Sequence, residues 1–325
     1  MVECLTMLHA PDKIKVIFIV GTTHSGSTLL DMIIGSAPEA FSMGELAFYN
    51  IYRNQLKYKG RHYENRICGC LKEHEKCDFW NSVKTDERLN IRKVLTVRQS
   101  LLISIGILFP FLKIGSKLKD DTFSLLQRIS EKAGYPEYLV DSSKDPRRLY
   151  TLMQDSRIEL YPVVLVRSPL AIGFTYVHGK RVTDGIGHAK GNFFGSSIKA
   201  ASIAFFSWLL AKRNPHSVFL TYEMFCSNPK QGIQRLNQAL GIHIDGDNFV
   251  KRVNEQVHHN LDGNRIRHQE LTGIHFDERW KRETGIVKKA LAYLLVAPFL
   301  WVYADIGHRI RKQSSDLPLV QKKAR

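Results

Sequence analysis

The stretch IKVIFIVGTTHSGSTLLDMIIGS, residues 14–36, decides the fold. Its first eight residues, apolar except for Lys15, are rich in β-branched side chains and end in glycine, which is typical of a central strand in a parallel sheet. Residues 27–36 have the apolar spacing of a helix, and the segment GTTHSGST begins at the end of the strand and leads into it. A Gly/Ser-rich turn between a strand and a helix directs backbone N–H groups at the helix N-terminus, where they attract a phosphate-sized anion.

Further apolar runs extend this pattern along the chain. Three of them are predicted as strands: residues 138–140, 163–166 and 218–220. Helical patterns alternate with these runs, at residues 146–154, 197–213 and 229–240. This alternation predicts an α/β fold: a doubly wound, mostly parallel central sheet with a P-loop-like phosphate loop.

The composition is that of a globular protein. Hydrophobic residues make up 44% and charged residues 24% of the 325-residue chain, which excludes a disordered, collagen-like or coiled-coil protein. Lys and Arg number 47 against 31 Asp and Glu, so the net charge of +16 favours anionic partners. The basic residues are scattered, without the aromatic–basic motifs of RNA- or DNA-binding modules, and we expect no nucleic-acid partner.

The N-terminus favours a cytoplasmic protein. It contains acidic Glu3 and no long apolar region, so we expect neither a signal peptide nor an N-terminal anchor. Apolar runs at residues 101–112 and 290–304 each contain a proline and fall short of the roughly 20 residues of a membrane-spanning helix. A buried helix is favoured for each run, and peripheral membrane contact stays open as an alternative.

The phosphate loop departs from that of nucleoside triphosphatases. Its glycines, Gly21 and Gly26, have P-loop spacing, but Ser27 stands where a P-loop has the lysine that reaches the β- and γ-phosphates. The loop therefore suits one phosphate that bears a leaving group, and a Gly/Ser turn without function is the alternative. It resembles the 5′-phosphosulfate loop of sulfotransferases that use 3′-phosphoadenosine-5′-phosphosulfate (PAPS), with His24 where that family usually has arginine or lysine.

A second segment carries the same resemblance. Residues 163–175 resemble the family's 3′-phosphate site, in which an arginine at a strand end is followed eight residues later by a serine. Arg167 and Thr175 occupy these two places. A guanidinium fork and a hydroxyl suit a terminal phosphate dianion. The alternative is an Arg167 held in a structural ion pair, with Thr175 capping a helix or solvated.

Three shorter segments are also similar to sulfotransferase motifs. DSSKDP at residues 141–146 is similar to the family's [DN]-x-[ST]-K-D-P turn, and TYEMF at residues 221–225 to a segment after a strand. HHNLDGNRIR at residues 258–267 resembles a GN-x-x-R cofactor loop. The resemblance covers residues 14–285 and implies the following cofactor-binding residues: Thr23, His24, Ser25, Gly26, Ser27, Thr28, Arg167, Thr175, Tyr222, Gly263, Asn264 and Arg267.

The resemblance also implies catalytic roles. Glu45, in a Gly-Glu pair past the first helix, is the candidate base, and a helix cap or an ion pair is its structural alternative. Lys144 and His24 are predicted to stabilise the departing oxygen, although an imidazole is fully charged only at acidic pH. The family needs no metal, so none is expected. Asp141 and Asp145 are therefore not predicted as metal ligands.

The resemblance implies an enzyme that moves a sulfuryl group from PAPS to a hydroxyl or amine of a small molecule, glycan, lipid or peptide. Residues 1–308 would form one domain, with residues 46–134 as a mostly helical insertion on the acceptor side and residues 309–325 as a basic tail. One alternative is a P-loop kinase or NTPase with Asp141 as its Walker-B-like acid. Another is a non-catalytic nucleotide-binding protein.

A cysteine-rich run lies inside the predicted insertion. Cys68, Cys70, His74 and Cys77 have the close spacing of metal ligands, and zinc would take three thiolates and an imidazole. The tight C-x-C spacing, and a similar run in bacterial-type sulfotransferases, favour structural thiols or one local disulfide over zinc.

Overall fold

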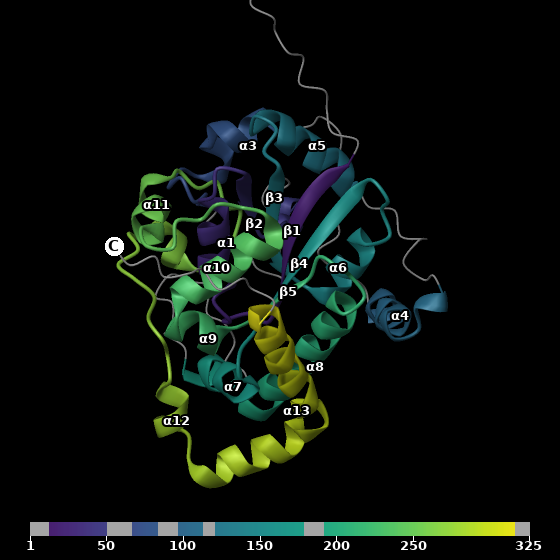
Figure 1. Ribbon diagram of the computed structural model, residues 1–325. Helices are drawn as coiled ribbons and strands as arrows, with labels where there is room; N and C mark the ends of the chain where they lie inside the picture. The colour runs from purple at the N-terminus through teal and green to yellow at the C-terminus, as the bar shows by residue number, and fades with distance from the viewer. Residues whose placement is uncertain (1–12, 51–66, 84–96, 113–120, 179–191, 316–325) are drawn as a thin grey trace, which may run out of the picture.

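The computed structural model describes residues 13–50, 67–83, 97–112, 121–178 and 192–315. Within these ranges the core is a five-stranded sheet of β1 (Ile14–Gly21), β2 (Ala40–Gly44), β3 (Tyr138–Lys144), β4 (Ile158–Val166) and β5 (Val218–Thr221). The strand order is β2-β3-β1-β4-β5, and every neighbouring pair is parallel (Figure 1). The predicted α/β fold with a mostly parallel central sheet is confirmed.

All the strands predicted from apolar runs are present, and one was missed. β3 extends beyond the predicted residues 138–140, and β4 begins before residue 163. β2 escaped prediction because its sequence, AFSMG, is short and contains no β-branched residue. β2 is the edge strand beside β3, and it places Gly44 next to Asp141 in register.

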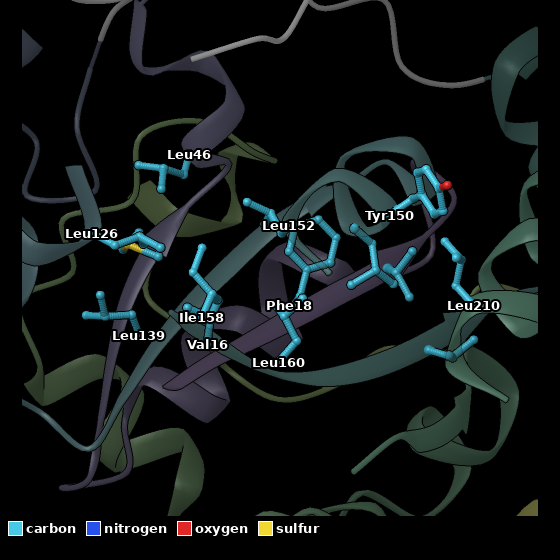
Figure 2. Close-up of a cluster of buried hydrophobic side chains, with 14 of the residues drawn as sticks. Val16, Phe18, Leu46, Leu126, Leu139, Tyr150, Leu152, Ile158, Leu160 and Leu210 are labelled. Atoms are coloured by element: carbon cyan, nitrogen blue, oxygen red, sulfur yellow. The ribbon is translucent and has the colours of Figure 1, made fainter. Parts of the chain in front are cut away.

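β1 is buried on both sides because helices cover both faces of the sheet. Ile17 and Ile19 pack with α1 (Ser27–Gly35), α10 (Pro229–Leu240) and α11 (Phe249–Glu255). Val16, Phe18 and Val20 face the other layer, whose helices are α5 (Thr122–Lys132), α6 (Pro146–Leu152) and α8 (Phe193–Ala211). Figure 2 shows this second layer, where Phe18 lies near Leu152 and Leu160. Burial on both faces explains why β1 is apolar at nearly every position.

The predicted insertion lies between β2 and β3. Its described residues hold the 3-10 helices η1 (Leu46–Phe48), η2 (His74–Lys76) and η3 (Pro110–Leu112), and the helices α3 (Asp78–Ser82), α4 (Val97–Leu108) and α5. An isolated antiparallel bridge joins Ile67 and Glu73. Residues 51–66, 84–96 and 113–120 of this predicted insertion lie outside the described residues.

The second half of the chain adds the remaining described helices: α7 (Pro169–His178), α9 (Tyr222–Ser227), η5 (Arg265–His268), α12 (Arg279–Glu283) and α13 (Ile286–Ser315). The apolar run at residues 290–304 was expected to be too short for a spanning helix, but it lies inside α13, which has 30 residues. Pro298 does not end the helix, and α13 bends between its lime and yellow halves (Figure 1).

Residues 309–315, the first part of the predicted basic tail, are helical. α13 continues to Ser315 because Ile310 is buried, and the carbonyl of Ile310 accepts a hydrogen bond from Arg235 Nη1 (2.6 Å). Among the described helices, α8 and residues 286–313 of α13 are long and apolar enough to cross a membrane by length and composition alone. The most apolar window of α8 is 44% buried inside the protein and that of α13 is 22% buried, so α8 is the more firmly packed of the two.

Candidate active site

The carboxyl ends of all five strands lie on one edge of the sheet, because the strands are parallel. Every strand delivers a residue singled out from the sequence to this edge. In sheet order these residues are Glu45 after β2, Lys144 at the end of β3, the loop of residues 21–28 after β1, Arg167 after β4, and Tyr222 after β5. The fold therefore gathers segments that are far apart in the chain.

The loop after β1 leaves the N-terminus of α1 without a side-chain cap. Gly26, the N-cap, has a left-handed backbone (φ 87°), and no acidic residue occupies the first turn of the helix. Ser25 Oγ turns back and donates to the carbonyl of Thr22 (2.6 Å), while His24 also has a positive φ of 64°. Gly21 is required as glycine, because an added Cβ would lie 2.1 Å from the carbonyl oxygen of Leu165. The uncapped first turn is the arrangement that binds an anion at a helix N-terminus.

Arg167 lies directly after β4 and contacts this loop through a hydrogen bond. Its Nη1 donates to the carbonyl of His24 (2.8 Å), and its Nη2 donates to the carbonyl of Asp277 (3.0 Å). The guanidinium lies over the ring of Tyr222, 4.2 Å from its centroid, and the buried Nε has no hydrogen-bond partner. Arg167 Nη2 also lies 3.5 Å from Asp277 Oδ2. Arg167 therefore takes part in a structural ion pair, which was the alternative to a phosphate-binding role.

Asp277 is held ionised mainly by a different arginine. Hydrogen bonds from Arg279 lower the pKa of Asp277 to about 2, and Arg167 adds to this effect by charge. Asp277 therefore stays negative near Arg167 at any pH of interest. The Tyr222 hydroxyl accepts from the backbone N–H of Asp277 (3.1 Å), and burial raises the pKa of Tyr222.

Helix α7 approaches the loop through a residue that the sequence did not reveal. The hydroxyl of the predicted Thr175 donates to the carbonyl of Ala171 (2.9 Å), one helical turn earlier. Its neighbour Tyr176 contacts the loop directly: the two hydroxyl oxygens of Tyr176 and Thr23 are 2.6 Å apart. The Tyr176 ring also meets the imidazole of His24 edge-on at 5.1 Å. An aromatic residue in an apolar helix is read as core, so no sequence signal marked it.

The predicted GN-x-x-R segment packs against the first turn of α1. The backbone N–H of Asn264 donates to Thr28 Oγ1 (2.9 Å), and Gly263 approaches so closely that a Cβ would lie 2.8 Å from this oxygen. Arg267 donates from Nη1 to the carbonyl of Gly263 (2.6 Å) and from Nη2 to that of Ile67 (3.1 Å). In this structure Arg267 braces the segment, and its buried Nε has no partner.

Glu45 and Lys144 form an ion pair at the same edge of the sheet. Both side chains are largely buried, with 13% of Glu45 and 10% of Lys144 exposed. Lys144 has a left-handed backbone (φ 67°), a conformation that costs a residue with a Cβ roughly 1–3 kcal/mol and is found most often at functional sites. The structure therefore joins the candidate base to the candidate leaving-group cation.

Two buried aspartates lie behind this pair. Asp141 accepts from the N–H of Ser143 (2.9 Å) and from Nε of Arg148 (3.2 Å), so both of its carboxylate oxygens have partners. Asp31 is fully buried in α1 and accepts at Oδ2 from Ser42 (2.7 Å) and from Asn260, while its Oδ1 has no partner.

Burial raises the pKa of Asp31 to about 7. Asp31 was not predicted as a site residue, although the sequence contains a signal for it. It is a lone acid within STLLDMIIG, an otherwise uncharged helix.

The cysteine-rich run meets a histidine from the far end of the chain. The structure places His259, rather than His74, beside Cys68, Cys70 and Cys77. His74 instead stacks on Trp80, with ring centroids 5.5 Å apart. No disulfide joins the cysteines in the described part of the chain, and the sulfurs of Cys70 and Cys77 are 3.6 Å apart.

The site thus defines an α/β protein with a candidate anion-binding loop beside an acid–base pair. No family model matches this sequence, and no curated protein matches it either. Several solved structures are similar. One is the sulfotransferase domain from the curacin biosynthetic pathway, which is 18% identical, with a TM-score of 0.47; the similarity covers 95% of this chain and 100% of that chain.

A second similar structure is the sulfotransferase domain of the Synechococcus PCC 7002 olefin synthase, which is 17% identical, with a TM-score of 0.45 and 95% of this chain and 98% of that chain covered. A third is a sulfotransferase from Mycobacterium avium, which is 12% identical, with a TM-score of 0.43 and 90% and 77% covered.

Proposed function

We propose that this chain is a sulfotransferase that moves the sulfuryl group of PAPS to a hydroxyl or amine acceptor. The observation that carries the proposal is the convergence of the Glu45–Lys144 pair with the uncapped N-terminus of α1 at one edge of the sheet. A carboxylate and a cation beside an anion site are the groups that in-line displacement at a sulfuryl centre needs.

The residues present fit the proposed donor. Backbone N–H groups of residues 25–28 are available to its 5′-phosphosulfate, because no side chain caps α1. Arg167, with a buried and unpartnered Nε, and Thr175 are the proposed partners of its 3′-phosphate. Tyr222, Gly263, Asn264 and Arg267 are proposed to enclose the nucleotide, by position in the sequence and by their packing around the loop.

The proposed chemistry divides charge between two groups. PAPS supplies an electrophilic sulfur whose bond to the phosphate oxygen breaks as the bond to the acceptor forms. Glu45 takes the proton that the acceptor hydroxyl loses, and Lys144 stabilises the negative charge that develops on the departing phosphate oxygen. Lys144 must therefore leave its contact with Glu45 when the donor binds, which frees the carboxylate to act as a base. His24 is proposed to donate to the same oxygen or to the sulfate.

Two rival functions are less well supported. A kinase or NTPase would need Asp141 free to hold Mg²⁺, but its oxygens are occupied by Ser143 and Arg148 and only 1% of the residue is exposed. The P-loop lysine is also absent, since Ser27 replaces it. A non-catalytic nucleotide-binding protein would have no use for the Glu45–Lys144 pair, and it would bind the product nucleotide without turnover.

Calorimetric titration with adenosine 3′,5′-bisphosphate, in parallel with ATP and Mg²⁺, tests the proposal. We expect one-to-one binding of the bisphosphate, and binding of ATP in its place would favour the kinase. Transfer of labelled sulfate from PAPS to a panel of small-molecule, glycan, lipid and peptide acceptors then separates an enzyme from a binding protein. Failure of both measurements would refute the proposed function.

We also propose a cytoplasmic protein that contacts a membrane surface through the first half of α13. Ile286, Val287, Leu291, Leu294 and Leu295 are all exposed there, while only a narrow stripe that includes Ala292 and Val296 is buried. Lys288 and Lys289 follow Val287 in the same helix, Lys289 Nζ donates to the carbonyl of Lys281 (2.7 Å), and the protein has a net charge of +16. An apolar face flanked by lysines suits an interfacial helix on anionic lipid.

A further inference from the structure

Four side chains with soft metal-binding atoms converge outside the sheet edge. Cys68, Cys70 and Cys77 come from the insertion, and His259 comes from the segment before the GN-x-x-R motif. One ligand atom from each of the four lies within 4.8 Å of all the others. We propose that these residues bind one zinc ion, in place of the free thiols or local disulfide expected from the sequence.

Three of the six separations between the ligand atoms match those of a tetrahedral site, and all six are within 4.8 Å. Zinc bonds of about 2.3 Å to sulfur and about 2.0–2.1 Å to nitrogen place neighbouring ligand atoms about 3.5–3.8 Å apart. The observed separations are 3.6 Å between Cys70 Sγ and Cys77 Sγ, 3.4 Å from Cys77 Sγ to His259 Nδ1, and 3.8 Å from Cys68 Sγ to His259 Nδ1. A disulfide requires sulfurs about 2.05 Å apart.

The chemistry of the donors selects zinc and a structural role. Three thiolates and one imidazole are a known tetrahedral zinc set, and harder ions such as Mg²⁺ prefer oxygen ligands. All four positions are filled by protein atoms, so no open position remains for a substrate or water. Cys68 and Cys77 are completely buried, which protects the thiolates from solvent and oxidants.

The surrounding contacts hold the ligands in place. Cys68 lies in a tight turn in which its N–H donates to the carbonyl of Lys72 (2.8 Å) and its carbonyl accepts from Leu71 (2.9 Å). The His259 ring stacks on Phe79 at 4.9 Å, and the His259 carbonyl accepts from Trp80 Nε1 (2.8 Å). The imidazole therefore presents Nδ1 to the sulfurs through contacts that do not involve the ligands themselves, as outer-shell partners do in metal sites.

This site would fasten the insertion to the edge of the candidate active site. Next to His259, Asn260 is fully buried and donates through its amide to Asp31 and to Ser42 Oγ (2.6 Å). The Asn260 carbonyl accepts from the N–H of Gly69 (3.2 Å), inside the cysteine run. A zinc ion at this point would couple the cysteine run to residues 258–264, the segment that packs on the first turn of α1.

Metal analysis of the full-length protein, purified under reducing conditions, tests the proposal. We expect one zinc per chain by inductively coupled plasma mass spectrometry. A mercurial thiol reagent should release it, as detected with a chromogenic zinc chelator. Replacement by Co²⁺ should give the intense visible absorption of a tetrahedral thiolate site. Absence of zinc after reconstitution, iron in its place, or a Cys70–Cys77 disulfide in the reduced preparation would overturn the proposal.

Matched variants assign the ligands. Cys70→Ser and His259→Gln should lose stoichiometric zinc, whereas His74→Gln and Cys226→Ser should retain it, since His74 faces Trp80 and Cys226 lies in α9. Retention of zinc by His259→Gln together with loss in His74→Gln would refute this ligand set. Where a variant fails to fold, as judged by circular dichroism, the zinc content and cobalt spectrum of the unmutated protein still decide.

The zinc measurement is independent of the proposed sulfotransferase activity. Removal of zinc by a chelator should lower the melting temperature and, if the proposed function holds, also the affinity for adenosine 3′,5′-bisphosphate. A zinc-loaded protein that fails to bind the bisphosphate would count against the proposed function and leave the zinc site standing.

Discussion

Replacing Glu45 with glutamine tests the centre of the proposed mechanism. Glu45→Gln keeps the shape of the side chain and an oxygen that can accept from Lys144, but it removes the negative charge and the base. Loss of a general base lowers kcat by about 10²–10⁴-fold, which corresponds to about 3–5 kcal/mol of transition-state stabilisation. The folded protein should lose about 1–3 kcal/mol, because a largely buried lysine exchanges a charged partner for a neutral one.

The same substitution should not weaken the binding of the product nucleotide. Without the charge of Glu45, Lys144 attracts an anion at least as strongly as before, so the Kd for adenosine 3′,5′-bisphosphate should stay the same or fall. Single-turnover transfer from labelled PAPS gives the rate of the chemical step, and calorimetry gives the Kd.

Glu159→Gln is the matched control, because Glu159 lies near the opposite end of β4 and accepts from the Tyr161 hydroxyl (2.8 Å). Unchanged turnover in Glu45→Gln, or equal losses of turnover and affinity, would refute the role of Glu45 as the base.

Three further predictions follow from the same structure. Arg167→Ala should weaken binding of the bisphosphate about 10- to 100-fold by calorimetry, the value of a charge-assisted contact, while the surface variant Arg157→Ala should not change it. Burial raises the pKa of Asp31 to about 7, so ionising this carboxyl destabilises the folded protein. This destabilisation is absent below about pH 4, grows as the pH rises towards 7, and reaches about 4 kcal/mol above it. Urea unfolding at pH 5 and pH 8 should therefore show Asp31→Asn gaining stability relative to the unmutated protein at the higher pH; an equal difference at both pH values would contradict this. Leu294→Glu should abolish co-sedimentation with phosphatidylserine vesicles, and dimer loss on gel filtration without a change in vesicle binding would assign this face to a second copy instead.

The parts of the fold that could be predicted are those that the local sequence determines. Ile14–Gly21 is apolar at every position except Lys15 because the strand is buried on both faces, and the Gly/Ser turn and the helix follow within a few residues. Once the strands are known to be parallel, Arg167 and Lys144 must reach the same edge as the loop. Their convergence was therefore predictable from topology without any side-chain detail.

The parts that could not be predicted depend on contacts between distant segments. His259 lies 182 residues from Cys77, and nothing in the local pattern distinguishes it from His74, which has the expected spacing for a metal ligand. Tyr176 meets Thr23 across 153 residues. α13 continues beyond Pro298 and past residue 309 because Val302, Ile306 and Ile310 are buried in the core, a tertiary effect that overrides the local signals.

The order of strands in the sheet has a consequence for how this protein folds. β1 lies between β3 and β4, so Val16 must pair with Leu139 on one side and Ile14 with Ile158 on the other before the central strand is complete. Parallel pairings across such long loops have high contact order and form slowly. The loop of residues 21–28, Lys144 and Arg167 therefore acquire their arrangement only in a late, cooperative step. A fragment that ends before β4 should retain helices but bind no nucleotide, and synthesis on the ribosome would yield a competent site only after β4 has emerged.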